Sequence, residues 1–238
     1  MHKVNVPQYI LDRACLSHGR TTLFDSLDMS RTAHVIVDLQ NGFVAPGAPI
    51  EVPVAREIIA NVNAISAAVR RAGGVNAFLR YTSDPDEPQK WDVFFKNYMS
   101  PDRSAMQVET FRAGSEMHAL YPELDVTDED LIFDKTRFSG MIPGTCEMDD
   151  TLKARGIDTM IITGTLTNCC CESTARDAMQ MGYNIIFVTD GNATLTDEEH
   201  NATLLSMGAI FADLKTSAEV VALAEAAEAA DAVATAAE

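Results

Sequence analysis

Short runs of aliphatic and β-branched residues recur along the chain, each bounded by polar or glycine-containing segments. The run at 34–37 (HVIV) shows no alternation of polar and apolar positions, which favours a strand buried on both faces. Similar runs predict five further strands, at 75–79, 130–133, 158–163, 184–188 and 209–212.

Apolar residues return at helical spacing between these runs. One stripe consists of Ile58, Ile59, Val62, Ile65 and Val69. It predicts a helix over 54–71, which the glycine pair at 73–74 ends. Other helices are expected at 9–15, at 145–155, from Asp197 and from Ser217.

The alternation of strands and helices predicts an α/β fold, a single-domain parallel sheet of about six strands with helices on both faces. The domain is expected to span 33–216. Residues 1–32 would form an N-terminal arm that packs on the surface or on another subunit. Residues 217–238 would form a C-terminal helix that has little to bury from residue 224 onward and frays there.

The stretch GTLTNCCCESTARDA, at 164–178, combines a strand end, a tight turn and a helix start. Thr167 or Asn168 is the expected N-cap. Cys170 then lies in the first helical turn, about 100° away from the apolar stripe that begins at Cys171. The helix dipole and free backbone N–H groups there favour a thiolate, with a pKa below the usual value of about 8.5. The alternative is that three small apolar cysteines simply pack at a helix start.

This stretch resembles the isochorismatase-like cysteine hydrolases, which include nicotinamidases, N-carbamoylsarcosine amidases and ureidoacrylate amidohydrolases. The family pattern is matched by Gly164, Thr167, Asn168, Cys170, Ser173, Thr174, Arg176 and Asp177. The resemblance selects Cys170 as the nucleophile. It also implies a Rossmann-like three-layer fold, and it covers most of the chain, from about residue 33 to residue 213.

Two further motifs follow predicted strands in the family's order. DLQNGF, at 38–43, matches the motif whose Asp is the general base, so the resemblance assigns that role to Asp38 and places Phe43 in the substrate pocket. DKTRFSG, at 134–140, aligns Lys135 with the catalytic Lys, and Phe138 stands where a Tyr is more usual. Because parallel strands end at one sheet edge, Asp38, Lys135 and Cys170 are expected to meet there.

The resemblance implies the chemistry of an Asp-Lys-Cys triad. Cys170 would attack an amide, carbamoyl or ureido carbonyl to form an acyl-enzyme, and water would release the acid. The backbone N–H groups of Leu166 and Cys170 would form the oxyanion hole, with a cis peptide between Thr165 and Leu166. Two alternatives are a silent oligomeric ligand-binding relative and an isochorismatase-type ether hydrolase, although the latter lacks the nucleophilic Cys.

The long segment 82–127 is where family members vary and where substrate is selected. Trp91, Phe94, Phe95 and Tyr98 recur at helical spacing and predict an aromatic stripe. Core or subunit-interface packing is one interpretation, and a substrate wall that includes Trp91 is the other. Three arginines in or beside this segment are candidates for a substrate carboxylate: Arg80, Arg103 and Arg112. The metal-binding His residues of nicotinamidases have no counterpart in RYTSDPDEPQKW, at 80–91, so neither a metal nor a cofactor is expected.

Composition narrows the possible partners. The 238 residues carry a formal net charge of −17, which argues against nucleic acid and anionic membrane surfaces. No apolar run is long enough to span a membrane, and no signal peptide is evident at the N-terminus. The five cysteines include three in a row, a poor disulfide framework, so a cytoplasmic protein is expected. We expect a homodimer or homotetramer acting on a small-molecule amide. The triple cysteine also permits a redox role, in which Cys169 or Cys171 traps an oxidised Cys170.

Overall fold

The computed structural model describes residues 1–20 and 22–236, with the side chains of 14, 15, 18 and 234–236 left out. Cys15, one of the five cysteines, therefore has its side chain outside the described part. The six strands are β1 (Thr32–Val37), β2 (Val75–Tyr81), β3 (Leu131–Lys135), β4 (Thr159–Thr165), β5 (Asn184–Ala193) and β6 (Asp213–Lys215). They form one sheet in the order β3-β2-β1-β4-β5-β6, and every pairing is parallel. The predicted fold class is confirmed.

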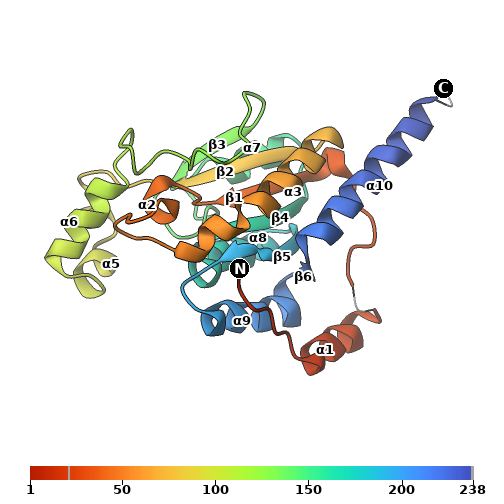
Figure 1. The fold of residues 1–238 in the computed structure, drawn as a ribbon, viewed down its shortest axis with the longest axis horizontal. Helices are drawn as coiled ribbons and strands as arrows, with labels where there is room; N and C mark the ends of the chain where they lie inside the picture. The colour runs from red at the N-terminus through yellow and green to blue at the C-terminus, as the bar shows by residue number, and fades with distance from the viewer. Residues whose placement is uncertain (21, 237–238) are drawn as a thin grey trace.

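Helices follow the strands along the chain (Figure 1). The α-helices are α1 (Gln8–His18), α2 (Asn41–Val44), α3 (Ile59–Arg71), α4 (Glu87–Lys90), α5 (Asp92–Asn97), α6 (Pro101–Thr110), α7 (Met148–Ala154), α8 (Glu172–Gln180), α9 (Asp197–Ser206) and α10 (Ser217–Ala236). Tighter or wider turns form η1 (Met29–Arg31), η2 (Pro53–Ile58), η3 (Thr167–Cys171) and η4 (Met207–Phe211).

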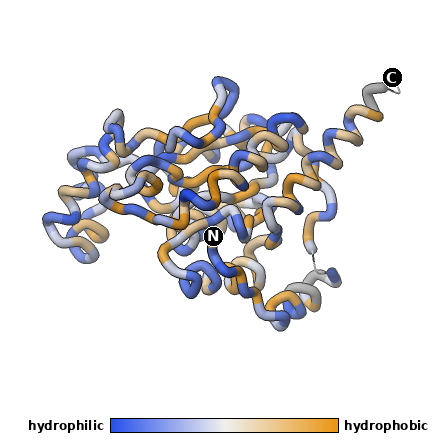
Figure 2. Tube along the Cα trace, in the orientation of Figure 1, coloured by the Kyte–Doolittle hydropathy of each residue, from blue (hydrophilic) through white to orange (hydrophobic). Residues whose placement is uncertain are grey.

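Alternate residues of each strand face opposite sides of the sheet, and both sides are covered. Val35 and Val37 pack with residues of α7 and α8, such as Leu152 and Ala175. On the opposite side, Ile36 packs with Val62 of α3 in one cluster, while Ile161 and Ile186 pack with Val69 and Val220 of α3 and α10 in another. Apolar residues accordingly gather at the centre of the molecule, where the strands and α3 lie (Figure 2).

Several boundaries differ from the prediction. The strand expected at 209–212 lies at Asp213–Lys215, because residues 207–211 extend the preceding helix as a π-helical turn. The helix expected from residue 54 begins with a 3-10 turn at Pro53 and becomes an α-helix only at Ile59. The aromatic stripe does not lie on one helix, since α4 ends at Lys90 and α5 begins at Asp92, with Trp91 between them.

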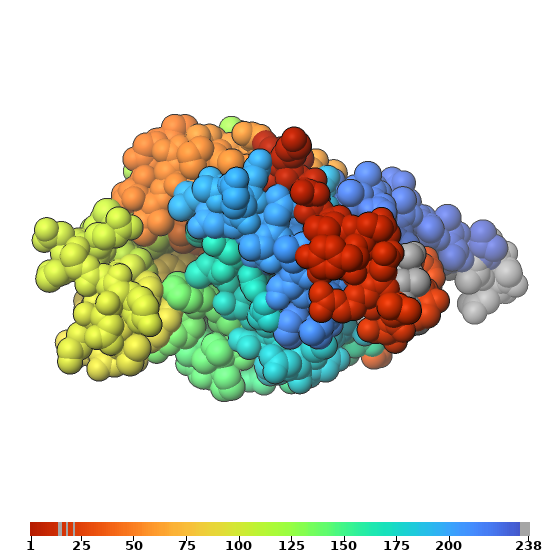
Figure 3. All heavy atoms as spheres, turned by 90° about the horizontal axis from the view of Figure 1, so that it is seen from below, coloured from red at the N-terminus to blue at the C-terminus, as the bar shows by residue number. Residues whose placement is uncertain are grey.

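The two chain ends behave differently. Ala224 is fully buried in the cluster with Ile161 and Ile186, so the expectation that α10 has little to bury from residue 224 onward is wrong at that residue. Further along, Val233 is exposed, and the helix extends away from the rest of the fold (Figure 1). The N-terminal segment instead lies against the chain around α9 and η4, at the other end of the molecule from α5 and α6 (Figure 3). None of the helices in the described residues is long and apolar enough to cross a bilayer.

Candidate active site

Three chain segments reach the same edge of the sheet. Asp38 directly follows β1, Lys135 is the last residue of β3, and β4 leads into the turn that carries Cys170. The strand order β3-β2-β1-β4 places these carboxyl ends within a span of four adjacent strands. The sheet therefore brings together the three residues that the motifs selected.

Asp38 and Lys135 form an ion pair with no solvent exposure on either side chain. Lys135 Nζ donates to Asp38 Oδ2 at 2.7 Å and to the Arg137 carbonyl oxygen at 3.1 Å. Among the described residues, Asp38 Oδ1 has no hydrogen-bond partner. Asp38 also has a φ of +52°, a left-handed conformation that is uncommon outside glycine. The chain thus holds a buried carboxylate whose second oxygen is left for the neighbouring Cys170 thiol and the Tyr81 N–H.

Burial and mutual attraction shift the pKa values of Asp38 and Lys135. Burial raises the pKa of Asp38 above its ordinary value, although Lys135 and the nearby Cys170 thiol oppose the shift. Burial disfavours the charge on Lys135, but the Asp38 carboxylate and the Cys170 sulfur outweigh it and raise the pKa of Lys135. Lys135 therefore stays cationic, and Asp38 becomes a stronger proton acceptor than an exposed carboxylate.

The Cys170 turn begins with a close approach of two strands. Gly164, at φ +123°, has no room for a side chain, because a Cβ there would lie 2.1 Å from the Val37 carbonyl oxygen. The peptide between Thr165 and Leu166 is cis, as expected. Leu166, not Thr167 or Asn168, is the N-cap, and it makes no side-chain capping bond. The hydroxyl of Thr167 instead contacts His200, and the amide oxygen of Asn168 accepts from Thr194.

The expected low pKa of Cys170 is wrong for this structure. A contact with the Cys169 thiol and full burial raise the pKa of Cys170, and they outweigh the cationic Lys135. Cys170 is only 4% exposed, so desolvation of a thiolate dominates over the helix dipole. Cys170 therefore rests as a thiol and needs a base to become a nucleophile.

A small cavity of about 110 Å³ opens onto Cys170. Its walls are mostly apolar and are formed by Phe43, Ile50, Tyr81, Gln107, Phe111, Phe138, Leu166, Cys169 and Cys170. Phe43 and Phe138, the two phenylalanines that the motifs singled out, both line this cavity. Trp91 does not reach this cavity; it lies in a neighbouring groove that shares only Phe138 with it.

The sequence interpretation missed part of this wall. Gln107 of α6 donates to the Tyr81 hydroxyl at 2.9 Å, so the two form a polar spot in an apolar cavity. Phe111 stacks on Phe43 with ring centroids 4.5 Å apart. Tyr81 is the last residue of β2, two residues beyond the strand predicted at 75–79, and its place after that strand was a usable signal. Gln107 and Phe111 come from a segment without a motif, and nothing in the local sequence marks them.

Gln40 is the other missed residue, although it lies inside a recognised motif. Its amide donates to the carbonyl oxygens of Tyr81 and His118, at 3.0 and 2.8 Å, and accepts from the Tyr81 N–H at 2.8 Å. One buried side chain therefore ties the loop after β1 to the end of β2 and to the segment before β3. This explains why the motif needs an amide there.

Comparison with known proteins agrees with this geometry. The family model for the isochorismatase domain matches residues 32–219. An uncharacterised isochorismatase family protein from Bacillus subtilis, YwoC, is 34% identical over 183 residues, which cover 75% of this chain and 86% of the relative. The chain belongs to the isochorismatase family.

Two other relatives of this isochorismatase-family chain carry functional names. The ureidoacrylate amidohydrolase RutB of Variovorax paradoxus is 30% identical over 190 residues, 71% of each chain. The crystal structure of a cysteine hydrolase from Pseudomonas syringae superposes with a TM-score of 0.78 at 25% identity, covering 87% of this chain and 98% of that one.

The candidate substrate-binding arginines of this family member lie elsewhere. Arg80 pairs with Asp134 at 2.8 Å, and Arg112 pairs with Glu109 at 2.9 Å. Neither they nor Arg103 line the cavity at Cys170. Another arginine, Arg137, follows Lys135 by two residues; it pairs with the buried Glu87 and stacks over Trp91 at 4.8 Å in the neighbouring groove.

Within residues 1–20 and 22–236, no group of three His, Cys, Asp or Glu side chains is arranged to hold a metal ion. His118 is buried and pairs with Thr82 at 2.7 Å, with Asp134 3.5 Å away. These two contacts engage the Nε2 atom of His118.

Proposed function

We propose that this chain is a cysteine amidohydrolase that cleaves a C–N bond of a small amide, carbamoyl or ureido compound. The observation that carries the proposal is the Asp38–Lys135 pair, fully buried beside Cys170 and with one carboxylate oxygen unpartnered among the described residues. A buried polar atom without a partner is costly in a structural ion pair and useful in a site that must accept a proton.

In the proposed reaction Asp38 takes the Cys170 proton, and the cationic Lys135 stabilises the thiolate that is left. The thiolate sulfur attacks the carbonyl carbon and forms a tetrahedral intermediate. The backbone N–H groups of Leu166 and Cys170 are the proposed donors to its oxyanion. The C–N bond then breaks, the amine leaves with the proton from Asp38, and a thioester remains.

Water completes the proposed cycle. Asp38 is again a carboxylate at this stage, so it removes a proton from water, whose oxygen attacks the thioester carbonyl. The acid leaves and the proton returns to the Cys170 sulfur. The named amidohydrolase relative supports C–N hydrolysis rather than ether hydrolysis. The small apolar cavity supports a compact acyl or carbamoyl group.

The test is ammonia release from a panel of small amides, carbamoyl amino acids and ureido acids. Wild type is compared with Cys170→Ala and with Cys171→Ala as the matched control, because Cys171 is a neighbouring thiol buried in the core. Release that disappears in Cys170→Ala and persists in Cys171→Ala supports the proposal. Equal release by all three proteins contradicts it. Ligand binding without turnover by wild type would indicate a silent binding protein.

A further inference from the structure

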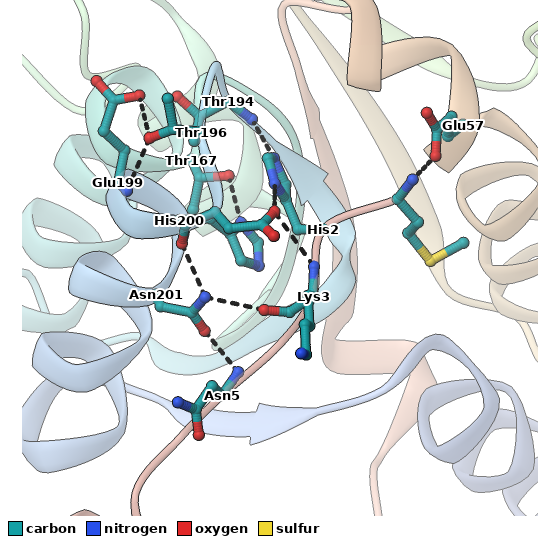
Figure 4. A network of polar contacts seen from close by, with 12 residues as sticks. His2, Lys3, Asn5, Glu57, Thr167, Thr194, Thr196, Glu199, His200 and Asn201 are labelled. Carbon is teal, nitrogen blue, oxygen red and sulfur yellow. Dashed lines mark hydrogen bonds and ion pairs between the residues drawn. The ribbon is translucent and has the colours of Figure 1, made fainter.

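The first five residues pack against α9 and the segment before it, whose residues in turn contact the Cys170 turn, although they lie outside the family domain at 32–219. The Lys3 N–H donates to Asp197 Oδ1 at 3.3 Å, and the Asn5 N–H donates to Asn201 Oδ1 at 2.6 Å. The Asn201 amide returns a hydrogen bond to the Lys3 carbonyl oxygen at 3.0 Å. The segment therefore lies along the N-terminal half of α9 as an added, ordered piece (Figure 4).

His2 is the buried anchor of this segment. Its side chain is 3% exposed, and Nδ1 lies 2.8 Å from Asp197 Oδ1. Its other nitrogen, Nε2, accepts from the Thr194 N–H at 3.0 Å. Since Nε2 accepts, Nδ1 must carry the proton and donate it to the carboxylate. Both ring nitrogens are thus satisfied in one tautomer.

Two routes lead from His2 to the turn. In the first, the His2 ring stacks on His200 with centroids 4.5 Å apart and planes 19° from parallel. His200 Nε2 lies 3.0 Å from the Thr189 carbonyl oxygen, which can only accept, so Nδ1 accepts from the Thr167 hydroxyl at 3.0 Å. Burial lowers the pKa of His200 to about 4, so Nδ1 stays unprotonated near neutral pH and can accept this hydrogen bond.

The second route runs through Thr194. Its backbone N–H donates to His2, and its hydroxyl donates to Asn168 Oδ1 at 2.7 Å. Thr167 and Asn168 immediately precede the cysteines in the turn η3. The two routes therefore connect neighbouring residues of the turn, Thr167 and Asn168, to one side chain at the start of the chain. Figure 4 shows His2 with Thr194 and with the His200–Thr167 contact.

We propose that His2 is a positioning residue for the proposed nucleophile, and that residues 1–5 act as a brace that holds the Thr167–Cys170 turn in its reactive geometry. The inference rests on the proposed function for its catalytic consequence. The ordering of the turn itself does not depend on that function and can be measured separately.

The experiment measures amide hydrogen exchange of the peptide that spans 164–180, together with kcat and KM. His2→Ala is expected to speed exchange in this peptide about tenfold through local opening and to lower kcat about tenfold, since small misplacements of a nucleophile are costly. KM should stay within about twofold because the cavity walls are unchanged. Lys3→Ala, an exposed side chain in the same segment, is the matched control and should match wild type.

Two further variants separate the contacts. His2→Gln offers an amide acceptor and donor, and should recover most of the lost protection and activity. His2→Phe keeps the stacking on His200 but loses the contacts to Thr194 and Asp197, so it should protect the turn less than His2→Gln and more than His2→Ala. Thr194→Val breaks the second route alone, and serves as the test if His2→Ala does not fold.

The brace is overturned if a folded His2→Ala protein exchanges at the wild-type rate in 164–180. It is also overturned if exchange rises evenly through the whole molecule, or if His2→Gln behaves no better than His2→Phe. Should Cys170→Ala retain hydrolysis while His2→Ala still loosens the turn, the proposed function fails and the brace stands.

Discussion

Two buried lysine–aspartate pairs lie at strand ends in this fold, and they are built differently. Asp38–Lys135 joins the ends of β1 and β3 with one carboxylate oxygen unpartnered in the described residues. Lys215–Asp213, in β6, is also largely buried, at 8% and 5% exposure, with Nζ and Oδ2 3.1 Å apart. The difference lies in what else each carboxylate binds.

One oxygen of the Asp213 carboxylate, Oδ2, is saturated with donors. This oxygen accepts from the Thr22 hydroxyl at 3.1 Å and from the N–H groups of Leu23 and Phe24, both at 3.0 Å. Lys215 Nζ also donates to the Thr22 hydroxyl at 2.7 Å. This pair fastens residues 22–24 to the sheet edge. A pair whose carboxylate also binds backbone N–H groups stabilises the fold, whereas a buried pair beside a thiol is suited to chemistry.

The same substitution in both pairs gives the largest expected difference. Asp38→Asn removes the proposed proton acceptor and should lower kcat/KM about a thousandfold. Asp213→Asn, the matched control, should leave kcat/KM of the folded protein within about twofold, because it is remote from the chemistry. Steady-state ammonia release measures both. Equal losses in the two variants would remove the distinction between the pairs.

The unfolding free energy should fall when the Asp213–Lys215 pair is broken. Asp213→Ala leaves Lys215 buried without its counterion and releases residues 22–24, so we expect a loss of about 3 kcal/mol in unfolding free energy. Urea unfolding followed by circular dichroism measures it. Lys90→Ala, which breaks an exposed ion pair with Asp86, should cause no measurable change. An unchanged unfolding free energy in Asp213→Ala would show that the contacts of the Asp213 carboxylate do not stabilise the fold.

His34 shows what burial alone does to a titratable group outside both pairs. It is fully buried in β1 between Thr163 and Ser66, and burial lowers its pKa to about 3. The unfolded chain binds the proton more tightly, so stability is complete above pH 6.5 and falls as the pH drops toward 3. The expected slope from this residue is about 1.4 kcal/mol per pH unit.

Urea unfolding at pH 6, 5 and 4 checks this slope. The His34→Gln variant cannot titrate there and should lose less stability than wild type over the same interval. Identical pH profiles for the two proteins would mean that His34 is charged in the folded state, and that burial does not control titration in this sheet.

The smallest expected effect concerns how far the candidate substrate site extends beyond the cavity at Cys170. Phe138 lines the cavity at Cys170, whereas Trp91 lies only in the neighbouring groove. Phe138→Ala should raise KM about tenfold or more through lost apolar contact. Trp91→Ala should change KM less than about threefold, since only outer contacts are lost. A reversed order of the two KM values would extend the substrate site into the groove.

Much of the architecture could be predicted because continuous apolar runs such as 34–37 and 184–188 have few alternatives to a buried parallel strand. The placement of Asp38, Lys135 and Cys170 at one sheet edge followed from parallel topology. The strand β6 was misplaced because Ala209 and Ile210 are apolar, yet Ile210 is 63% exposed in a π-helical turn. Local hydrophobicity does not distinguish these outcomes.

The rest of the candidate site depends on long-range contacts. Gln107 reaches Tyr81 from a helix whose position no local pattern specifies, and His2 meets Thr194 across 192 residues. The pKa of Cys170 was also wrongly expected, because the helix dipole can be inferred from a turn while burial cannot. Contacts of this kind become visible only when the whole chain is folded.

The shape of the chain ends has a practical consequence for immobilising the protein. The C-terminal part of α10 points away from the body, at the opposite end from α2, which follows Asp38 (Figure 1). The first five residues, by contrast, are threaded onto α9, and the Met1 amino group pairs with Glu57 (Figure 4). A surface linker or fluorescent label therefore belongs on the C-terminal helix, where it leaves the reactive edge of the sheet unobstructed.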